Sequence, residues 1–243
     1  MVENNSNGTE DKSSTIEEFL REKARLDKII KERFKRRVTI LFTDICDYTQ
    51  YMDTKGDITG RGMLQIHNDI VLPLIEKHEG IVIKTIGDAV MATFSAPLKA
   101  VKASIEIQNG LNEYNRNIEK SDRIYVKIGI NMGEALMDKT DVFGDAVNVA
   151  SRIQSQAEKE QVLISRNVYE QVGGSEDILC RLHGTVLLKG KAEPVELYRV
   201  VWKDDDIVVS SEPRVRAGER EAQTEVKPSL KVLHLEITRE EDS

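Results

Sequence analysis

The order in which strand-like and helix-like segments follow one another between residues 38 and 132 constrains the fold most. Short runs rich in β-branched and aromatic residues are typical of strands, and apolar residues at three- and four-residue intervals are typical of helices. The strand-like runs lie at 38–43, 81–86, 89–94 and 124–132, and the helical ones at 62–79 and 97–114. Gly87 and Asp88 separate two of the strands as a tight turn, which predicts a hairpin. The order predicts an α+β fold with a ferredoxin-like βαββαβ core, in which an antiparallel sheet carries helices on one face.

Additional elements extend this core towards the C-terminus. Helical patterns are expected at 145–157 and 166–173, and strands at 161–164, 179–188 and 195–202. We therefore expect one domain over residues 37–202. The polar composition of residues 1–14 predicts disorder, and residues 203–243 are expected to be mostly flexible. Within that tail, an alternating apolar pattern at 230–238 indicates an edge strand.

Residues 15–36 have the pattern of a separate helix. Ile16, Phe19, Leu26 and Ile30 fall near one stripe at helical spacing, but Lys23 interrupts a heptad repeat. The segment is expected either to form a short dimerising coiled coil with a second copy or to pack on its own domain.

Bulk composition argues against several classes of protein. The 243 residues carry a net charge of −7, unlike the basic footprint of a protein that grips nucleic acid. No run reaches the roughly 18 apolar residues of a transmembrane helix, and the polar N-terminus lacks the apolar core of a secretory signal. Cys46 and Cys180 form no CxxC motif, as expected of free thiols in a reducing compartment. We expect a cytoplasmic protein with no membrane segment and no nucleic-acid partner.

Two carboxylates are candidates for metal binding. Asp44 ends the first strand, and Asp88 lies in the turn of the hairpin that is expected beside it. Carboxylates at neighbouring strand ends suit Mg²⁺, which binds one or two of them together with phosphate oxygens. The loop at residues 45–49 precedes a helix, so its N–H groups could cradle phosphate. Taken alone, an aspartate in a glycine turn is more often structural.

Basic residues near the C-terminus of the domain are candidates for contact with phosphate. Asn148 and Arg152 are four residues apart in an expected helix, so they share a face. Arginine suits bidentate contact with phosphate and stays charged. Leu188-Lys-Gly-Lys191 is a basic turn between the last two strands. Isolated examples of both features are usually solvated surface groups.

Together these stretches resemble the catalytic domain of class III adenylate and guanylate cyclases, over residues 38–202. The matching stretches, in the family's order, are Phe42-Thr-Asp-Ile45, Lys84-Thr-Ile-Gly-Asp88 with Ala89-Val-Met-Ala92, Asp141-Val-Phe-Gly-Asp-Ala-Val-Asn-Val-Ala-Ser-Arg152, and Leu188-Lys-Gly190 with Glu193-Pro-Val-Glu-Leu-Tyr198. The resemblance implies the class III cyclase fold.

The resemblance also implies two functional pairs. Asp44 and Asp88 match the aspartates that hold two divalent cations, Mg²⁺ or Mn²⁺, with the Ile45 carbonyl as a backbone ligand. Lys84 and Asp141 match the pair that reads the purine. Members that use ATP have Lys and Asp (or Thr) there, whereas guanylate cyclases typically have Glu and Cys. The resemblance therefore implies an adenylate cyclase that converts ATP to 3′,5′-cyclic AMP and pyrophosphate.

Three further residues are implied to act from a second protomer. Asn148 matches the residue that orients the ribose, Arg152 the one that stabilises the pentavalent phosphorane, and Lys189 a lysine that contacts the triphosphate. In the family these groups, together with the pair that reads the purine, come from one protomer and face the metal aspartates of the other. The resemblance thus implies a homodimer with two equivalent sites and an inactive monomer.

Two departures from the family pattern leave alternatives open. First, many members have Gly followed by Phe where this chain has Asp47 and Tyr48. Second, many members have a longer segment where this chain has residues 134–140. That longer arm carries a basic residue for the phosphates, which Lys139 would have to replace. A carboxylate at position 47 should repel triphosphate, which favours a catalytically silent nucleotide-binding signalling module. The other alternative is a guanylate cyclase. Lys84 and Asp141 argue against it, because guanylate cyclases typically have Glu and Cys at these positions.

Overall fold

The fold is built on one sheet, seen in a computed structural model that describes residues 15–203. The strands are β1 (Lys35–Ile45), β2 (Ile81–Ile86), β3 (Ala89–Phe94), β4 (Val126–Met137), β5 (Val142–Phe143), β6 (Val162–Ser165), β7 (Leu179–Val186) and β8 (Val195–Val201). The helices are α1 (Ile16–Phe34), α2 (Tyr48–Lys55), α3 (Asp57–Lys77), α4 (Pro97–Asn115), α5 (Asp145–Gln156) and α6 (Arg166–Val172), with a short 3₁₀ turn at Lys120–Asp122. The expectations for residues 1–14 and for the tail beyond Lys203, including the strand at 230–238, lie outside the described residues.

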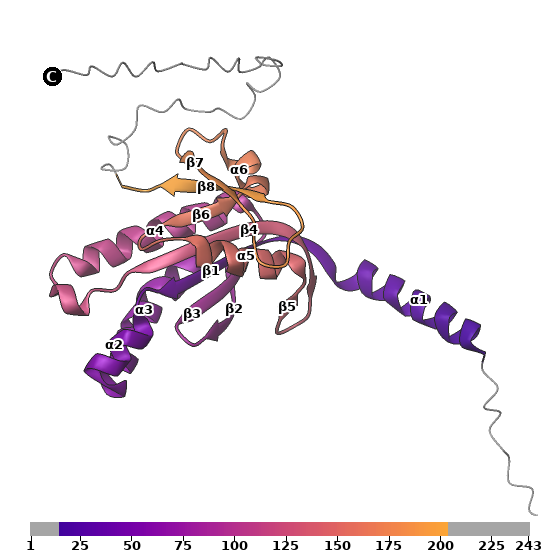
Figure 1. The fold of residues 1–243 in the computed structure, drawn as a ribbon, viewed down its shortest axis with the longest axis horizontal. Helices are drawn as coiled ribbons and strands as arrows, with labels where there is room; N and C mark the ends of the chain where they lie inside the picture. The colour runs from indigo at the N-terminus through magenta and orange to yellow at the C-terminus, as the bar shows by residue number, and fades with distance from the viewer. Residues whose placement is uncertain (1–14, 204–243) are drawn as a thin grey trace, which may run out of the picture.

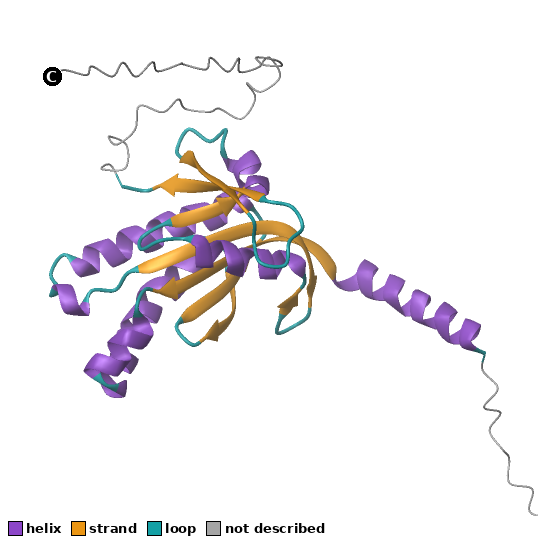
Figure 2. Ribbon diagram, viewed as in Figure 1, coloured by secondary structure: helices purple, strands orange, loops and turns teal. Residues whose placement is uncertain are grey.

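Strand β1 lies inside the sheet, between β3 and β4, because it can be buried on both faces. The strands lie in the order β2-β3-β1-β4-β6-β8-β7, with β5 beside β4 (Figure 2). Residues 38–43 of β1 are all buried, and β1 pairs antiparallel with both β3 and β4. Successive side chains point to opposite faces. Leu41 therefore packs in the core that α3, α4 and α6 share, and Ile40 packs in a second core that includes residues of α5.

Helix α5 lies on the opposite face of the sheet from α3 and α4. It connects β4 to β6, and these two strands run parallel, with Ile128 paired to Val162 and Ile130 to Ile164. Parallel neighbours need a crossover connection, usually a helix, and this one crosses the face that α3 and α4 leave open. The α+β core with its additional C-terminal elements is confirmed. Within that core, β1 to β4 pair antiparallel and carry α3 and α4 on one face, as expected. The added elements extend it with a parallel strand pair and place α5 on the other face.

A glycine sets how closely α5 approaches β4. A Cβ atom placed on Gly129 would lie 2.1 Å from the backbone nitrogen of Gln154 and 2.5 Å from its Cα atom. The helix backbone therefore rests directly on the strand, and no side chain fits between them. This contact fixes the C-terminal half of α5 relative to the centre of the sheet.

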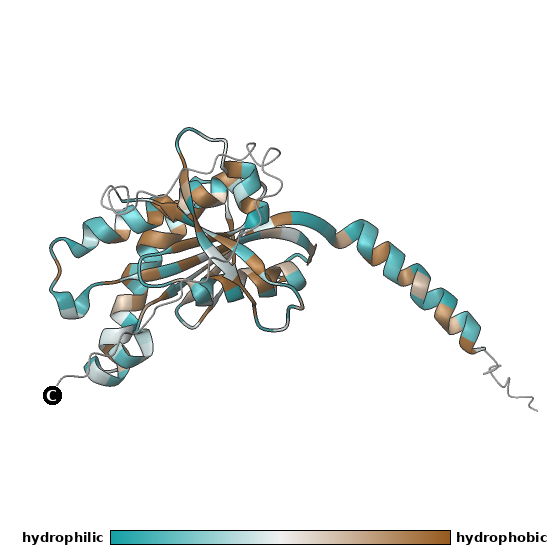
Figure 3. Cartoon of the chain, turned by 45° about the horizontal axis from the view of Figure 1, so that its top comes forward, coloured by the Kyte–Doolittle hydropathy of each residue, from teal (hydrophilic) through white to brown (hydrophobic). Residues whose placement is uncertain are grey.

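Helix α1 projects from the body of the protein (Figure 1). Thr15 and Glu18 form a capping box at its start, in which each side chain accepts a hydrogen bond from the other's backbone N–H. No residue of α1 is buried, and its apolar residues recur along an otherwise polar helix (Figure 3). Pairing with a second copy stays a prediction. Between residues 15 and 203, no helix combines the length and apolar character that a membrane span requires.

Candidate active site

Asp44 and Asp88 are brought together by the pairing of β1 with β3. Asp44 is near the end of β1, and Asp88 lies in the β2–β3 turn, where its Oδ2 accepts a hydrogen bond of 3.0 Å from the N–H of Ile45. Burial and, second, the negative charge of Asp44 raise the pKa of Asp88 above its usual range. The Ile45 side chain is buried, so this residue meets the site through its backbone. Two carboxylates in mutual repulsion are a donor set that suits a hard cation.

Two donors hold one oxygen of Asp44. The Lys127 ammonium lies 3.3 Å from Asp44 Oδ2, and the Gln154 side-chain amide donates to the same oxygen at 3.2 Å. Lys127 is directly opposite Asp44 in the β1–β4 register, so both side chains lie on the α5 face. Sequence reasoning missed both residues. The strand register could have revealed Lys127, but nothing in the sequence pattern marks Gln154.

Lys84 and Asp141 form an ion pair across 57 residues of sequence. The Lys84 Nζ atom lies 2.7 Å from Oδ1 and 2.6 Å from Oδ2 of Asp141, and the backbone N–H of Val142 also donates to Oδ1. The hydrogen bond from Lys84, and then that from Val142, lower the pKa of Asp141 below its usual value. The pair thus joins β2 to the loop before β5, and both side chains keep part of their surface exposed.

Arg152 and the turn at Leu188-Lys-Gly-Lys191 lie side by side. A Cβ on Gly190 would be 3.4 Å from Nη2 of Arg152, so the guanidinium lies against the glycine backbone. Leu188 is buried and anchors the turn, which leaves Lys189 exposed. Asn148, one turn before Arg152, is exposed as well. The structure therefore brings Arg152 and the basic turn together, and neither Asp44 nor Asp88 of the same chain takes part in that contact.

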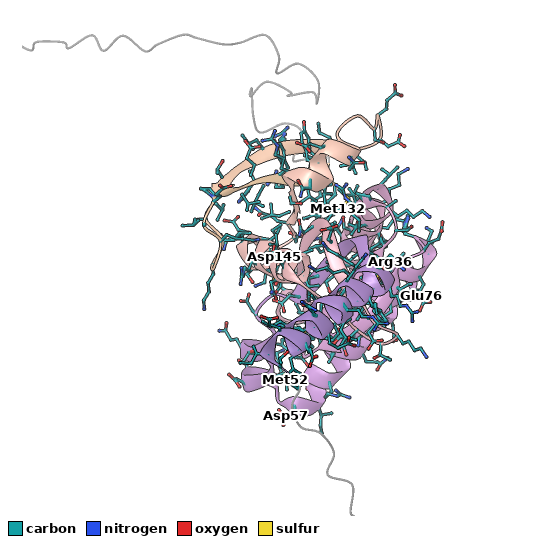
Figure 4. The ribbon with its side chains drawn as sticks, turned by 90° about the vertical axis from the view of Figure 1, so that its right-hand side faces the viewer. Arg36, Met52, Asp57, Glu76, Met132 and Asp145 are labelled. Carbon is teal, nitrogen blue, oxygen red and sulfur yellow. The ribbon has the colours of Figure 1, made fainter. Side chains whose placement is uncertain are left out.

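Helix geometry places the side chains of Gln154 and Arg152 on opposite sides of α5. Residues two apart on an α-helix point about 160° apart. Gln154 faces Asp44 of its own chain, so Arg152 points almost directly away from that carboxylate. Asp145, labelled in Figure 4, lies at the start of α5. It pairs with Lys191 of the basic turn.

Asp47 adopts a backbone conformation that favours glycine. Its φ angle is +60°, and its exposed side chain makes no hydrogen bond to the start of α2. Among residues 15–203, no three acidic, histidine or cysteine side chains are placed to hold one metal ion, so Asp47 does not join Asp44 and Asp88. The short arm at 134–140 is the end of β4 and a turn closed by Asp138 and Asp141, in which Lys139 is exposed.

A hollow of about 460 Å³ lies beside Lys191 of the basic turn. It lies beside the start of α5 and the first residue of β1, and its lining includes Lys35, Asp145 and Arg166. None of the eight residues predicted from sequence lines it. Of the eight, only Asn148 and Lys189 are exposed; Ile45 is buried and the others are half-buried.

Comparison with known proteins identifies the family. The adenylate and guanylate cyclase catalytic domain family matches residues 30–201. The adenylate cyclase of Anabaena cylindrica is 34% identical over 185 residues, which cover 68% of this chain and 37% of that protein. A protein of Rhizobium meliloti (strain 1021), whose name assigns it provisionally to the adenylate cyclases, is 31% identical over 204 residues, 84% of this chain and 34% of its own length. The chain thus spans about a third of the length of these relatives.

Solved structures agree with the family match. The adenylyl cyclase CyaB from P. aeruginosa superimposes with a TM-score of 0.60 at 25% identity, covering 69% of this chain and 94% of that one. An adenylate/guanylate cyclase/hydrolase structure from Silicibacter pomeroyi gives a TM-score of 0.63 at 25% identity, covering 69% and 97%. The fold and the sequence therefore lead to one conclusion: the chain belongs to the adenylate and guanylate cyclase catalytic domain family.

Proposed function

We propose that this protein is an adenylate cyclase that converts ATP to 3′,5′-cyclic AMP and pyrophosphate at sites shared between two copies of the chain. The observation that carries the proposal is the joint arrangement of two pairs, Asp44 with Asp88 and Lys84 with Asp141, on one sheet. The first pair supplies carboxylates for cations, and the second supplies a donor and an acceptor for a base.

The choice of ATP over GTP follows from the donors and acceptors of the base. Adenine presents an acceptor at N1 and a donor at its 6-amino group, whereas guanine presents an acceptor at O6 and a donor at N1. A lysine donates and a carboxylate accepts, so Lys84 and Asp141 are complementary to adenine. Their mutual ion pair holds the two side chains together before substrate arrives. A base that left either of them unpaired would bind less well.

Asp44 and Asp88, with the Ile45 carbonyl, would hold two divalent cations, Mg²⁺ or Mn²⁺. Bound there, the cations would favour ionisation of the ribose 3′-hydroxyl and offset charge on the departing pyrophosphate. Asp44 and Asp88 keep their carboxylates close together despite repulsion, which pre-organises them for positive charge.

The remaining groups act by position and charge. Arg152 places a permanent positive charge where negative charge develops on the α-phosphate, and Lys189 adds charge for the triphosphate. Asn148 is on the same face of α5 and its side chain is exposed, so it can contact the ribose. Holding the ribose favours in-line attack of its hydroxyl within one molecule. No protein nucleophile is needed.

A shared site accounts for the direction of Arg152. Because Gln154 faces the chain's own Asp44, Arg152 points away from it and is available to the aspartates of a second copy. A homodimer then holds two equivalent sites, each with aspartates from one protomer and Arg152 from its partner.

A complementation assay tests the proposal. The Asp44→Ala and Arg152→Ala chains should each be inactive, and mixed dimers should regain up to half of the parent activity, because one site then has both residues intact. Product formation from ATP and from GTP is measured with Mn²⁺. Absence of cyclic AMP from a parent dimer that binds ATP would favour a silent nucleotide-binding module, and faster cyclic GMP formation would favour a guanylate cyclase.

A further inference from the structure

One side chain outside the proposed catalytic set controls the surroundings of Asp44. Gln154 is 8% exposed, and its Nε2 donates to Asp44 Oδ2 at 3.2 Å. Lys127 contacts the same oxygen at 3.3 Å, which leaves Oδ1 without a contact to either donor. The two donors thus select which oxygen of the carboxylate stays available.

The two donors constrain Asp44 differently. An ammonium is a point charge with three rotatable donors on a flexible stem, so it can follow a carboxylate through many orientations. A planar amide has directional donors, and this one is fixed to a helix that rests on β4 without space at Gly129. Ile153, the neighbouring residue of α5, is fully buried, which further limits movement of the backbone. Gln154 is therefore the donor that can fix the orientation of Asp44.

We propose that Gln154 is a positioning residue for Asp44, so that each α5 helix serves both sites of a dimer. Gln154 orients the aspartate of its own protomer's site, and Arg152 on the opposite side of α5 serves the partner's site. This inference rests on the shared-site adenylate cyclase proposed above.

The proposal predicts a specific defect in metal binding. Without Gln154, Asp44 pairs with Lys127 alone and turns more freely, so a cation must compete with the ammonium and reorient the carboxylate. Gln154→Met keeps the length of the side chain and removes the amide. We expect Mn²⁺ binding to weaken about tenfold, as for loss of a hydrogen bond to a charged group. Gln156→Met is the matched control, because Gln156 is an exposed glutamine at the end of the same helix.

A dimer with a single complete site separates positioning from a general structural effect. One chain carries Asp44→Ala and the other Arg152→Ala, and two different affinity tags isolate the mixed dimer. Its one complete site takes Asp44 from the Arg152→Ala chain and Arg152 from the Asp44→Ala chain. Gln154→Met on the chain that donates Asp44 should raise the Mn²⁺ concentration for half-maximal rate about tenfold. The same change on the other chain should alter it less than about twofold.

A binding measurement without turnover completes the test. Electron paramagnetic resonance of free Mn²⁺ is recorded with full-length homodimers and a non-reacting ATP analogue, for the parent, Gln154→Met and Gln156→Met. Equal effects from both chains of the mixed dimer, or unchanged Mn²⁺ binding in Gln154→Met, would overturn the positioning role. An inactive mixed dimer would instead refute the shared site, and the Mn²⁺ measurement would still decide whether Gln154 positions Asp44.

Discussion

Replacement of Gly129 by alanine tests how closely α5 must approach β4. The new Cβ would lie 2.1 Å from the backbone nitrogen of Gln154, and an ordinary contact is at least 3.4 Å, so the helix must move by about 1.3 Å. The obstacle is backbone rather than the end of a flexible side chain, so relaxation is limited. Overpacking of this kind costs about 1–3 kcal/mol, and we expect a loss near 3 kcal/mol in the free energy of unfolding. For a domain of this size that lowers Tm by about 6–12 °C.

The same substitution should reduce activity even where the protein stays folded. Displacement of α5 by about 1 Å moves both Gln154 and Arg152, and misplacement on this scale can cost about 100-fold in rate. Urea titration followed by circular dichroism gives the stability, and the rate is measured at a temperature where the variant is fully folded.

A second glycine provides the matched control. Gly62 is in α3, has ordinary helical backbone geometry, and would place its Cβ in open space. Gly62→Ala should therefore stabilise the protein by about 0.5–1 kcal/mol, because alanine loses less backbone entropy in a helix. If Gly129→Ala unfolds at the same urea concentration as the parent, the inference of a close contact between α5 and β4 is wrong.

Three further predictions concern base choice, backbone strain and thiol reactivity. Lys84→Glu with Asp141→Cys should shift the ratio of kcat/KM for ATP over GTP towards GTP by at least tenfold, since the donors and acceptors are exchanged; an unchanged ratio would remove the base-reading role. Asp47→Gly should be more stable than Asp47→Ala by about 1 kcal/mol in urea titrations, because φ is +60° there; equal stabilities would contradict the strain. Burial raises the pKa of Cys46 to about 11 and that of Cys180 to about 12, so both thiols are neutral at pH 8. A disulfide reagent should therefore react with them much more slowly in the native protein than in the unfolded chain, and equal rates would refute this.

The sequence could predict the elements and much of the candidate site because local patterns encode them. The period of the apolar residues located β1, the β2–β3 hairpin and α4 to within a few residues, and the turn at Gly87-Asp88 placed one aspartate beside another. The family resemblance, rather than a local pattern, paired Lys84 with Asp141, and the structure joins them by an ion pair.

The tertiary structure alone decided the side of the sheet on which α5 lies and therefore which way its polar residues point. The helical period predicts that Asn148 and Arg152 share a helix face, but it does not predict which residues that face contacts. Because β4 and β6 are parallel, the connection between them must cross the sheet, and α5 crosses the face that α3 and α4 leave open. Gly129 has no side chain, so the backbone of α5 can pack directly against β4. These contacts join residues far apart in sequence, such as Asp44 and Gln154, and no local pattern encodes the packing of one element on another.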